Sequence, residues 1–297
     1  MKHKSENKVD ISVIQPTLGK KRNTLATVSN KLDGSKDLNT KSGNKVGISV
    51  IMPALNEGKN ILDAIGNTLK AFADFNIEGE IIVINDGSTD GTGELVNGVM
   101  KKDKRVRVIS HEAPKGIGAS FWDGVDSACG DIVVMLPGDN ENDPWEIFRY
   151  FKLLEHVDVV IPFIFNKEVR SLFRNAVSFI YRFIINTTFL VNFNYTNGTV
   201  FYRRAVLKKL HSRSNGFFFQ TDILIRLTKK NYLFAEVPYR VGKREHGVSR
   251  AISFPSLLQV IKGYLQLVKD YYFKKSKKTL VLLSRDSLTF ARRRRKR

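Results

Sequence analysis

The sequence predicts an α/β fold in which a mostly parallel sheet is flanked by helices. From residue 46 onward, short β-branched runs alternate with longer amphipathic stretches, a pattern typical of parallel βαβ units. The β-branched runs are apolar throughout, so helices should cover both faces of the sheet. Sheets of this kind bind ligands beyond the carboxyl ends of their strands, so functional residues are expected in the turns that follow the strands.

The alternation resolves into five strands and four helices. The predicted strands are Ile48 to Met52, Glu80 to Ile84, Val106 to Ile109, Ile132 to Leu136 and Val157 to Ile161. The predicted helices are Asn60 to Phe72, Gly91 to Met100, Gly118 to Ser127 and Trp145 to Leu154. Further along, Phe254 to Phe273 places its large apolar residues on one stripe, which predicts a C-terminal amphipathic helix.

Positive charge is concentrated in the two segments that flank this region. The 297-residue chain has 49 Lys and Arg residues against 29 Asp and Glu, a formal net charge of +20. Residues 1–45 contribute +6 and residues 274–297 contribute +10, which leaves +4 for residues 46–273. We therefore expect a flexible basic extension (1–45), one α/β domain (46–253), the amphipathic helix (254–273) and a basic tail (274–297). In the extension, Ile11 to Leu18 repeats Ile48 to Leu55, through partial duplication or through chance.

Composition excludes several classes of protein. With 42% hydrophobic residues the chain can bury a core, so wholesale disorder is excluded. The single cysteine, Cys129, allows neither an intramolecular disulfide nor a multi-cysteine zinc site, and favours a reducing compartment. Polar residues interrupt the longest apolar stretch, Ala176 to Val191, so we expect no spanning helix. The first ten residues lack the apolar core of a secretory signal.

Polar residues gather in the turns that follow three of the predicted strands. Because parallel strands end at one edge of a sheet, these side chains should converge there. Carboxylates at such an edge can hold a divalent cation, and the cation can hold a diphosphate, so a nucleotide or nucleotide-sugar is the expected ligand. The residues concerned are Asn56, Glu57, Asp86, Asp139 and Glu141.

Glycine-rich phosphate-binding turns do not account for this edge. The chain has no G-x-x-x-x-G-K-[ST] motif, and Gly116-Ile117-Gly118 lacks the third glycine of a dinucleotide-binding turn. Helix capping accounts for some of the polar residues. Ser88, Thr89 and Asp90 are expected to be N-terminal caps of the helix that follows them. A capping role for Glu141 and Asn142, just before Pro144, competes with a role in ligand binding.

Seven segments in order carry a resemblance to a known family. They are Val50 to Glu57, Ile84 to Thr92, Lys115 to Ser120, Asn197 to Arg203, Phe219 to Asp222, Glu236 to Pro238 and Arg244 to Arg250. Together they resemble family 2 glycosyltransferases, which have the GT-A fold. Within that family they most resemble dolichol-phosphate mannose synthases and bacterial polyprenyl-phosphate glycosyltransferases. The resemblance covers about residues 47–270, and it implies an inverting transfer of a hexose from a nucleoside-diphosphate sugar to a polyprenyl phosphate.

The resemblance also assigns residues to the donor. It implies that the nucleotide-sugar is held by Pro53, Asn56, Glu57, Asp86 and Lys115, together with Asp139. Asp139 matches the second Asp of the family's D-x-D metal motif, and Glu141 stands where many relatives have Gln. Because Pro137 replaces the first Asp of that motif, dependence on Mg²⁺ or Mn²⁺ is open.

On the acceptor side the resemblance points to arginines. Arg170 and Arg174 fall four residues apart in a predicted helix, and an arginine of this region contacts the acceptor phosphate in the family. Arg244 would neutralise the donor diphosphate, and Ser249 and Arg250 belong to the same motif. The alternative for each is an ordinary solvated cation.

The role of Asp222 depends on the acceptor. A polyprenyl phosphate is already anionic near neutral pH and needs no strong base, whereas a sugar hydroxyl does, and Asp222 matches the family's position for that base. A plain helix cap is the competing interpretation. The motifs favour the phosphate acceptor. Another glycan or lipid-linked acceptor is the first alternative, and a degenerate domain acting as a nucleic-acid-binding or scaffold protein is the second.

The distribution of charge predicts attachment to a membrane rather than to nucleic acid. An amphipathic helix beside basic residues suits an anionic membrane surface, where each nearby Lys or Arg contributes about 1 kcal/mol. We therefore expect peripheral attachment at the cytoplasmic face of a membrane through Phe254 to Phe273 and the basic tail, with a membrane partner protein as a further option.

Overall fold

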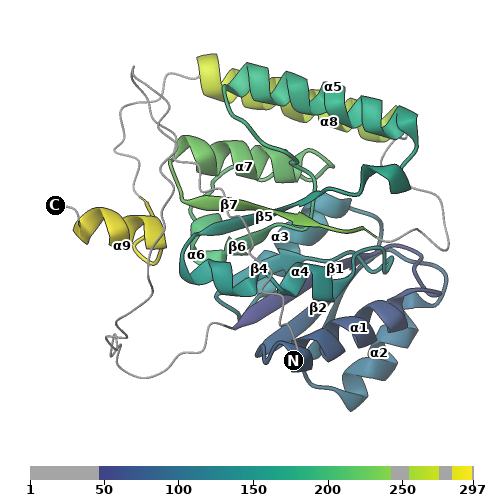
Figure 1. The fold of residues 1–297 in the computed structure, drawn as a ribbon. Helices are drawn as coiled ribbons and strands as arrows, with labels where there is room; N and C mark the ends of the chain where they lie inside the picture. Colours follow the sequence, from purple (N-terminus) through teal and green to yellow (C-terminus); the bar gives the residue numbers. More distant parts are fainter. Residues whose placement is uncertain (1–46, 242–253, 274–282, 296–297) are drawn as a thin grey trace, which may run out of the picture.

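A seven-stranded sheet organises the protein (Figure 1). The computed structural model describes residues 47–241, 254–273 and 283–295. The strands lie in the order β3-β2-β1-β4-β6-β5-β7, and all pairings are parallel except those of β6. They span β1 Ile48–Ala54, β2 Gly79–Asp86, β3 Val106–His111, β4 Ile132–Met135, β5 Val159–Ile164, β6 Phe201–Arg203 and β7 Phe234–Tyr239. The five predicted strands are confirmed, and β6 and β7 were not predicted.

The helices that connect the strands agree with the predicted ones, except after β4. There the predicted helix is divided into α4 and a 3-10 turn, Phe151–Glu155. At the break, the Tyr150 hydroxyl donates to the carbonyl oxygen of Pro238, a tertiary contact that sequence periodicity does not register. The α-helices are α1 Ile61–Asp74, α2 Thr92–Lys102, α3 Ile117–Ser127, α4 Pro144–Phe148, α5 Leu172–Phe189, α6 Arg204–Leu207, α7 Phe219–Lys229, α8 Phe254–Val268 and α9 Leu288–Arg295.

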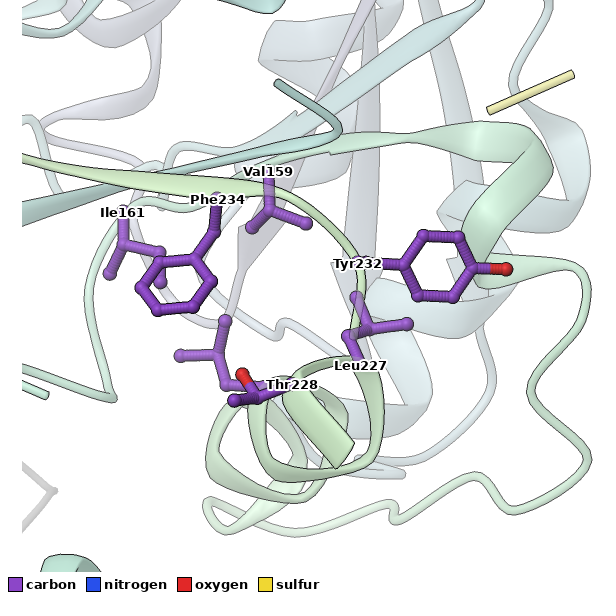
Figure 2. Close-up of a pocket in the computed structure, with 7 residues that line it drawn as sticks. Val159, Ile161, Leu227, Thr228, Tyr232 and Phe234 are labelled. Carbon is purple, nitrogen blue, oxygen red and sulfur yellow. The ribbon is translucent and has the colours of Figure 1, made fainter. Parts of the chain in front are cut away.

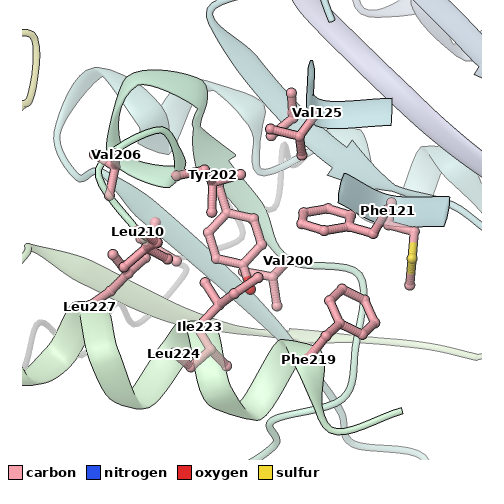
Figure 3. Close-up of a cluster of buried hydrophobic side chains, with 14 of the residues drawn as sticks. Phe121, Val125, Val200, Tyr202, Val206, Leu210, Phe219, Ile223, Leu224 and Leu227 are labelled. Atoms are coloured by element: carbon pink, nitrogen blue, oxygen red, sulfur yellow. The ribbon is translucent and has the colours of Figure 1, made fainter. Parts of the chain in front are cut away.

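Alternating side chains of the strands fill a core on each face of the sheet. Ile51 faces α3 and α7, whereas Val50 and Met52 face α1. Figure 3 shows the first of these cores, where Phe121, Tyr202 and Ile223 come together. The buried Tyr202 hydroxyl donates to Gln220 Oε1 at 2.8 Å, so its polar atom is satisfied. The prediction that helices cover both faces of an apolar sheet is therefore confirmed.

Apolar side chains of β5, β7 and α7 surround a small space in this core (Figure 2). Val159, Ile161 and Phe234 line it from the strands, and Leu227 and Thr228 line it from α7. Its lining carries no charged group, so it offers nothing that would bind a diphosphate. The functional site must lie elsewhere.

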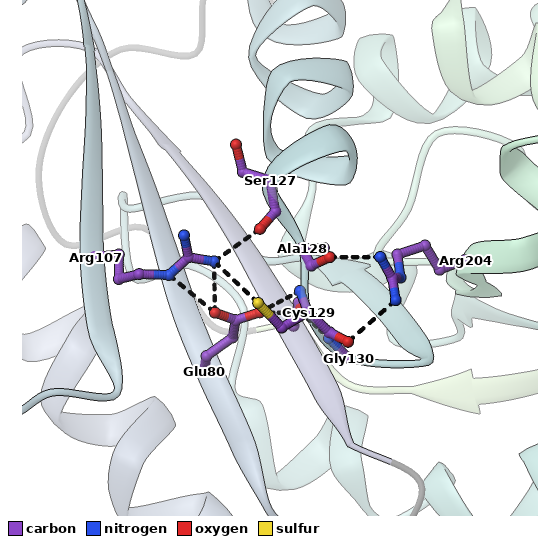
Figure 4. Close-up of polar contacts among 8 residues, drawn as sticks. Glu80, Arg107, Ser127, Ala128, Cys129, Gly130 and Arg204 are labelled. Carbon is purple, nitrogen blue, oxygen red and sulfur yellow. Dashed lines mark hydrogen bonds and ion pairs between the residues drawn. The ribbon is translucent and has the colours of Figure 1, made fainter.

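The edge of the sheet at which β1, β2 and β4 begin is held by Glu80 (Figure 4). Its carboxylate accepts hydrogen bonds from Ser49 Oγ, the Cys129 backbone N–H and the Arg107 guanidinium. Burial acts to raise the pKa of Glu80, but these hydrogen bonds outweigh it and lower the pKa. Beside it, Arg204 donates to the Ala128 and Cys129 carbonyl oxygens. The hydrogen bonds of Glu80 thus join β1, β2, β3 and the segment before β4, at the edge opposite the predicted ligand site.

Helices α5 and α8 lie side by side as a separate layer over α7 (Figure 1). Thr188 of α5 and Tyr264 of α8 share a hydrogen bond at 2.9 Å, and the Phe189 ring packs edge-on against Tyr264. A π-type turn, Lys269–Phe273, continues α8 and confirms the predicted helical region. None of the described helices is long and apolar enough to cross a membrane.

Residues 283–295, predicted as part of a basic tail, include α9, and its start is anchored to the sheet. Asp158, which is fully buried before β5, accepts hydrogen bonds from the backbone N–H groups of Leu288 and Thr289 and from the Thr289 hydroxyl. Arg203 Nε lies 3.4 Å from the same carboxylate. The arginines of α9 are exposed. The predicted extension, residues 1–45, and its internal repeat lie outside the described residues.

Candidate active site

The turns after β1 and β2 are fastened to each other at the carboxyl edge of the sheet. Asn56, in the left-handed conformation with φ 57°, accepts from the Thr89 backbone N–H at 2.8 Å. Its own backbone N–H donates to Ser88 Oγ at 3.0 Å. Asp90 accepts from the Gly58 backbone N–H at 2.9 Å. The expectation that Ser88 and Thr89 are helix caps is wrong, because the Ser88 hydroxyl and the Thr89 backbone N–H bind Asn56 in the other turn. Asp90 does contact the start of α2, where it accepts from the Thr92 backbone N–H at 3.1 Å.

Glu57 and Pro53 occupy the first of these turns and its strand. The Glu57 backbone N–H donates to Thr92 Oγ1 at 3.0 Å, and Glu57 Oε2 accepts from the Asn60 side chain at 2.8 Å. Pro53 is buried within β1, and its carbonyl oxygen accepts from the Gly138 backbone N–H at 2.9 Å. Through Gly138, the first turn is held against the turn that contains Asp139.

Asp86 is the most enclosed carboxylate of the edge, with 5% of its surface exposed. Its Oδ1 accepts from the Lys115 backbone N–H at 2.8 Å, and Oδ2 accepts from the Gly116 backbone N–H at 3.0 Å. Gly116 has φ 99°, a conformation that other residues rarely adopt. The Lys115 side chain is exposed. Asp86 and the Lys115 turn, both predicted donor residues, are therefore brought together.

Asp139 and Glu141 lie two residues apart in the turn after β4. Asp139 Oδ1 accepts from the Glu141 backbone N–H at 3.2 Å, around Asn140 in the left-handed conformation. The helix that follows is capped by Asp143, which accepts from the Trp145 backbone N–H, so the predicted capping role of Glu141 and Asn142 is wrong. Both carboxylates remain candidates for ligand binding.

These two carboxylates fit a divalent cation only in part. Carboxylate oxygens suit Mg²⁺ and Mn²⁺, but the part of the chain that the structure describes contains no cluster of three or more His, Cys, Asp or Glu side chains. Pro137 stands where the family motif has its first Asp. Most ligands of a cation here would have to come from donor phosphate oxygens and water.

Asp222 lies within α7, so the prediction of a helix cap is wrong. Both of its oxygens are 2.9 Å from Arg226 Nε, and a second nitrogen of Arg226 donates to Asp270, beyond α8, at 2.8 Å. Burial raises the pKa of Asp222, while the hydrogen bonds and charge of Arg226 act to lower it. The arginine therefore links the candidate catalytic carboxylate to the α5/α8 layer.

The arginines predicted to bind the acceptor phosphate are arranged differently from expectation. Ser171 caps α5, so the helix begins at Leu172 and Arg170 lies before it in extended conformation. The Arg170 guanidinium lies over the Tyr195 ring. Of the two arginines, Arg174 alone is on the helix, so the prediction that both lie in one helix is wrong. Arg244, Ser249 and Arg250 lie outside the described residues.

A polar cluster beneath α5 was missed by sequence reasoning. Thr221 of α7 contacts Thr196 and Asn197 at 3.1 Å and the Tyr181 hydroxyl of α5 at 2.8 Å. Burial raises the pKa of Tyr181 to about 12, which keeps its hydroxyl protonated as a hydrogen-bond donor. Asn197 and Thr221 belong to two of the segments that resemble the family. Their separation of 24 residues in the chain gives no sign that they touch.

Comparison with known proteins places this site in a family. The family description "Glycosyl transferase family 2" matches residues 49–211, more than half of the chain. The chain belongs to glycosyltransferase family 2. This glycosyltransferase is 30% identical over 192 residues to polyprenol monophosphomannose synthase of Mycolicibacterium smegmatis. The matched region covers 57% of the chain and 69% of the relative.

A second relative and the solved structures extend the comparison. Undecaprenyl-phosphate 4-deoxy-4-formamido-L-arabinose transferase of Salmonella paratyphi B is 30% identical over 188 residues, 61% of the chain but just 55% of the relative. Glucosyl-3-phosphoglycerate synthase of Mycobacterium tuberculosis, crystallised with Mn²⁺, UDP-glucose and phosphoglyceric acid, is 22% identical. It superimposes with a TM-score of 0.57 over 75% of the chain and 79% of the synthase. This likeness shows the GT-A fold.

Proposed function

We propose that this glycosyltransferase transfers a hexose, with inversion, from a nucleoside-diphosphate sugar to a polyprenyl phosphate at a membrane surface. Two relatives are named for polyprenyl or undecaprenyl phosphate. The observation that carries the proposal is the large apolar surface formed by α5 and α8, next to the polar cluster around Thr221. A lipid acceptor gives this surface a purpose, whereas a water-soluble acceptor leaves it unexplained.

The α5/α8 surface, defined by the exposed apolar residues of these helices and of the turn after α8, is unusually hydrophobic for a protein exterior. Leu172 is 88% exposed, Phe173 69% and Phe183 62%. The other members are Val177, Phe179, Ile180, Ile184, Leu190, Leu257, Leu258, Ile261, Leu265, Tyr271, Tyr272 and Phe273. Burying such side chains contributes about 1.5–3 kcal/mol each, which favours docking into the apolar region of a bilayer.

Charge on the same helices supports an anionic bilayer as the partner. Residues 172–190 and 257–273 contain Arg174, Arg182, Lys262 and Lys269 but a single acidic residue, Asp270, which is paired with Arg226. Cations beside an apolar face are attracted to anionic headgroups. In Figure 1, α9 lies apart from the α5/α8 layer, so its arginines do not extend this surface directly. The lysines of residues 274–282 lie outside the described residues.

The donor is proposed to bind at the carboxyl edge, where Asn56, Glu57 and Asp86 are held by the paired turns. Carboxylates accept hydrogen bonds from base N–H groups and ribose hydroxyls. A divalent cation, when bound, would neutralise charge on the diphosphate, and Asp139 with Glu141 would hold it. Lys115 would help to bind the nucleotide-sugar, and Arg244 would neutralise the departing diphosphate.

The acceptor phosphate is proposed to approach from the α5/α8 surface. Arg170 and Arg174, at the start of α5, would bind it, with Ser249 and Arg250 contributing from their motif. A phosphate monoester has its second pKa near 6, so the attacking oxygen is anionic at neutral pH without a general base. The engagement of both Asp222 oxygens by Arg226 supports this route. The protein then supplies positioning and charge stabilisation.

The test of this function is transfer of labelled sugar to lipid. The full chain would be incubated with a panel of radiolabelled GDP- and UDP-sugars and polyprenyl phosphate in detergent, with Mg²⁺, with Mn²⁺ or with EDTA. At least one donor should yield labelled lipid. Absence of labelled lipid from every donor overturns the proposal, and transfer only to a glycan hydroxyl identifies the alternative acceptor. Tight RNA or DNA binding without transfer favours the degenerate scaffold.

The membrane part of the proposal needs a separate measurement. The protein should float with vesicles that contain about 30% anionic lipid, more than with neutral vesicles, because both burial and charge contribute. Equal recovery with no vesicles, neutral vesicles and anionic vesicles would contradict peripheral docking.

A further inference from the structure

His111, the last residue of β3, is enclosed between two carboxylates. Its Nδ1 lies 2.7 Å from Asp86 Oδ1, and its Nε2 lies 3.0 Å from Asp123 Oδ2 of α3. The His111 side chain is 2% exposed, and that of Asp86 is 7% exposed. Asp86 is also the strand neighbour of His111 in the β2–β3 register. No motif of the sequence drew attention to this histidine.

The two contacts hold the ring at both of its nitrogens. The carboxylates that face it are Asp86 from β2 and Asp123 from α3. Lys115 Nζ lies 3.7 Å from Asp123 Oδ2. Because a ring N–H donates to a carboxylate oxygen, the ring can tie the end of β2 to α3.

This ring contacts the most enclosed carboxylate of the donor edge. Buried carboxylates need hydrogen-bond partners, and His111 Nδ1 is one for Asp86. Asp86 Oδ1 is occupied by His111 and the Lys115 backbone N–H. Among the described residues, Oδ2 accepts one hydrogen bond, from the Gly116 backbone N–H. A carboxylate oxygen accepts about two, so Oδ2 keeps room for a donor outside the protein.

We propose that His111 is a positioning residue for the donor nucleotide, which holds the Asp86 carboxylate turned so that Oδ2 can accept an N–H group of the base. The inference rests on the proposed function, because Asp86 is assigned there to the nucleotide. Since His111 acts through Asp86, its effect falls on donor binding. The rate of sugar transfer at saturating donor should depend on it much less.

The experiment measures binding of UDP and of GDP to the full chain by calorimetry, with Mg²⁺ present. His111→Gln should weaken the binding of the preferred nucleotide about tenfold or more. The donor KM should rise in parallel, with kcat changed less. His156→Gln, at an exposed histidine after β4, is the matched control and should behave as the wild type.

A second variant covers the event that His111→Gln fails to fold. Asp123 is half-exposed, and Asp123→Asn removes the carboxylate that faces His111 Nε2. Nucleotide affinity should then fall, but by less than in His111→Gln. Wild-type affinity in Asp123→Asn, or in folded His111→Gln, overturns the inference and leaves the donor site intact. If the wild type binds neither UDP nor GDP, the proposed donor site fails and this inference fails with it.

Discussion

The carboxyl edge of the sheet and the α5/α8 surface are built on opposite principles. At the edge, the polar turns of Asn56 and Asp86 are tied to neighbouring turns by hydrogen bonds. On the helices, side chains such as Phe173 and Phe183 are apolar and largely exposed. The edge is thus held together by its own hydrogen bonds, whereas the helix surface leaves large apolar side chains exposed. This difference agrees with the proposal of a polar donor at the edge and an apolar phase at the helices.

If the two regions have separate tasks, each can be disabled while the other stays intact. The largest effect is expected at the edge. Asp139→Asn should lower the rate of transfer about 10²–10³-fold, the size of effect found when one preorganised electrostatic group is removed from an active site. Flotation with anionic vesicles should not change. Initial rates and flotation of the same preparation provide the measurement.

Asp143→Asn is the matched control in the same turn. Its amide oxygen can still accept from the Trp145 backbone N–H, so the start of α4 should be kept and the rate should stay near that of the wild type. A normal rate in Asp139→Asn would assign that residue a structural role.

The next effect tests the helix surface. The double variant Phe179→Glu, Phe183→Glu places two charges where apolar rings are 58% and 62% exposed. Vesicle affinity should fall about 10²-fold or more, since each buried aromatic ring contributes about 1.5–3 kcal/mol. UDP or GDP affinity, measured by calorimetry, should be retained. Leu62→Glu on α1, 45% exposed, is the control, and equal loss of vesicle binding in that variant would refute a specific surface.

A smaller effect is expected at Asp222, which Arg226 joins to Asp270 beyond α8. If the acceptor is a phosphate, Asp222→Asn should lower the rate less than about tenfold, because a general base contributes about 10²–10⁴-fold and none is needed. The shape of the profile of rate against pH should be that of the wild type. A loss above about 10²-fold together with a changed acid limb would identify Asp222 as a base and favour a hydroxyl acceptor.

The smallest effect on function is expected at the edge where the strands begin. Glu80→Gln leaves hydrogen-bonding groups of Ser49 and Arg107 without their carboxylate, and should lower the free energy of unfolding by about 1–3 kcal/mol with a normal transfer rate. Because the pKa of Glu80 is lowered by folding, its stabilisation is present above the pKa of the unfolded chain and is lost as pH falls through the folded value.

Chemical denaturation at several pH values measures this effect. The difference between wild type and Glu80→Gln should shrink toward acid pH. Glu155→Gln, at an exposed site, should show no such difference. Loss of transfer in Glu80→Gln at full stability would contradict the separation between this edge and the site.

The sequence predicted those features that depend on local pattern. Alternation of apolar runs and helices placed five strands and located the turns of Asn56, Asp86 and Asp139, because parallel strands end together. The strand β6 was missed because three residues, Phe201–Arg203, carry too little periodicity. The helix predicted to contain Arg170 begins after it, because the Ser171 hydroxyl accepts from the Arg174 backbone N–H and caps α5.

Contacts between segments that are distant in the chain could not be predicted from the sequence. Arg226 has the sequence context of a surface cation on α7, yet it joins Asp222 to Asp270, 44 residues away from it. His111 gave no signal, because its importance comes from Asp86 and Asp123 on other elements. The exposed face of α5 shows in the sequence only as an interrupted apolar stretch, since periodicity cannot tell a face turned to the core from one turned outward.

The Asp158 carboxylate, buried before β5, has a consequence for how the chain comes to be made. The backbone N–H groups that satisfy it lie about 130 residues later, at Leu288 and Thr289. While the ribosome is still adding those residues, the Asp158 carboxylate has Arg203 beside it but lacks the N–H groups of Leu288 and Thr289, which leaves buried oxygens incompletely satisfied. A chain interrupted before Leu288 would keep that defect permanently. Completion of the fold is thereby tied to completion of synthesis, and shortened products would be left open to cellular proteases.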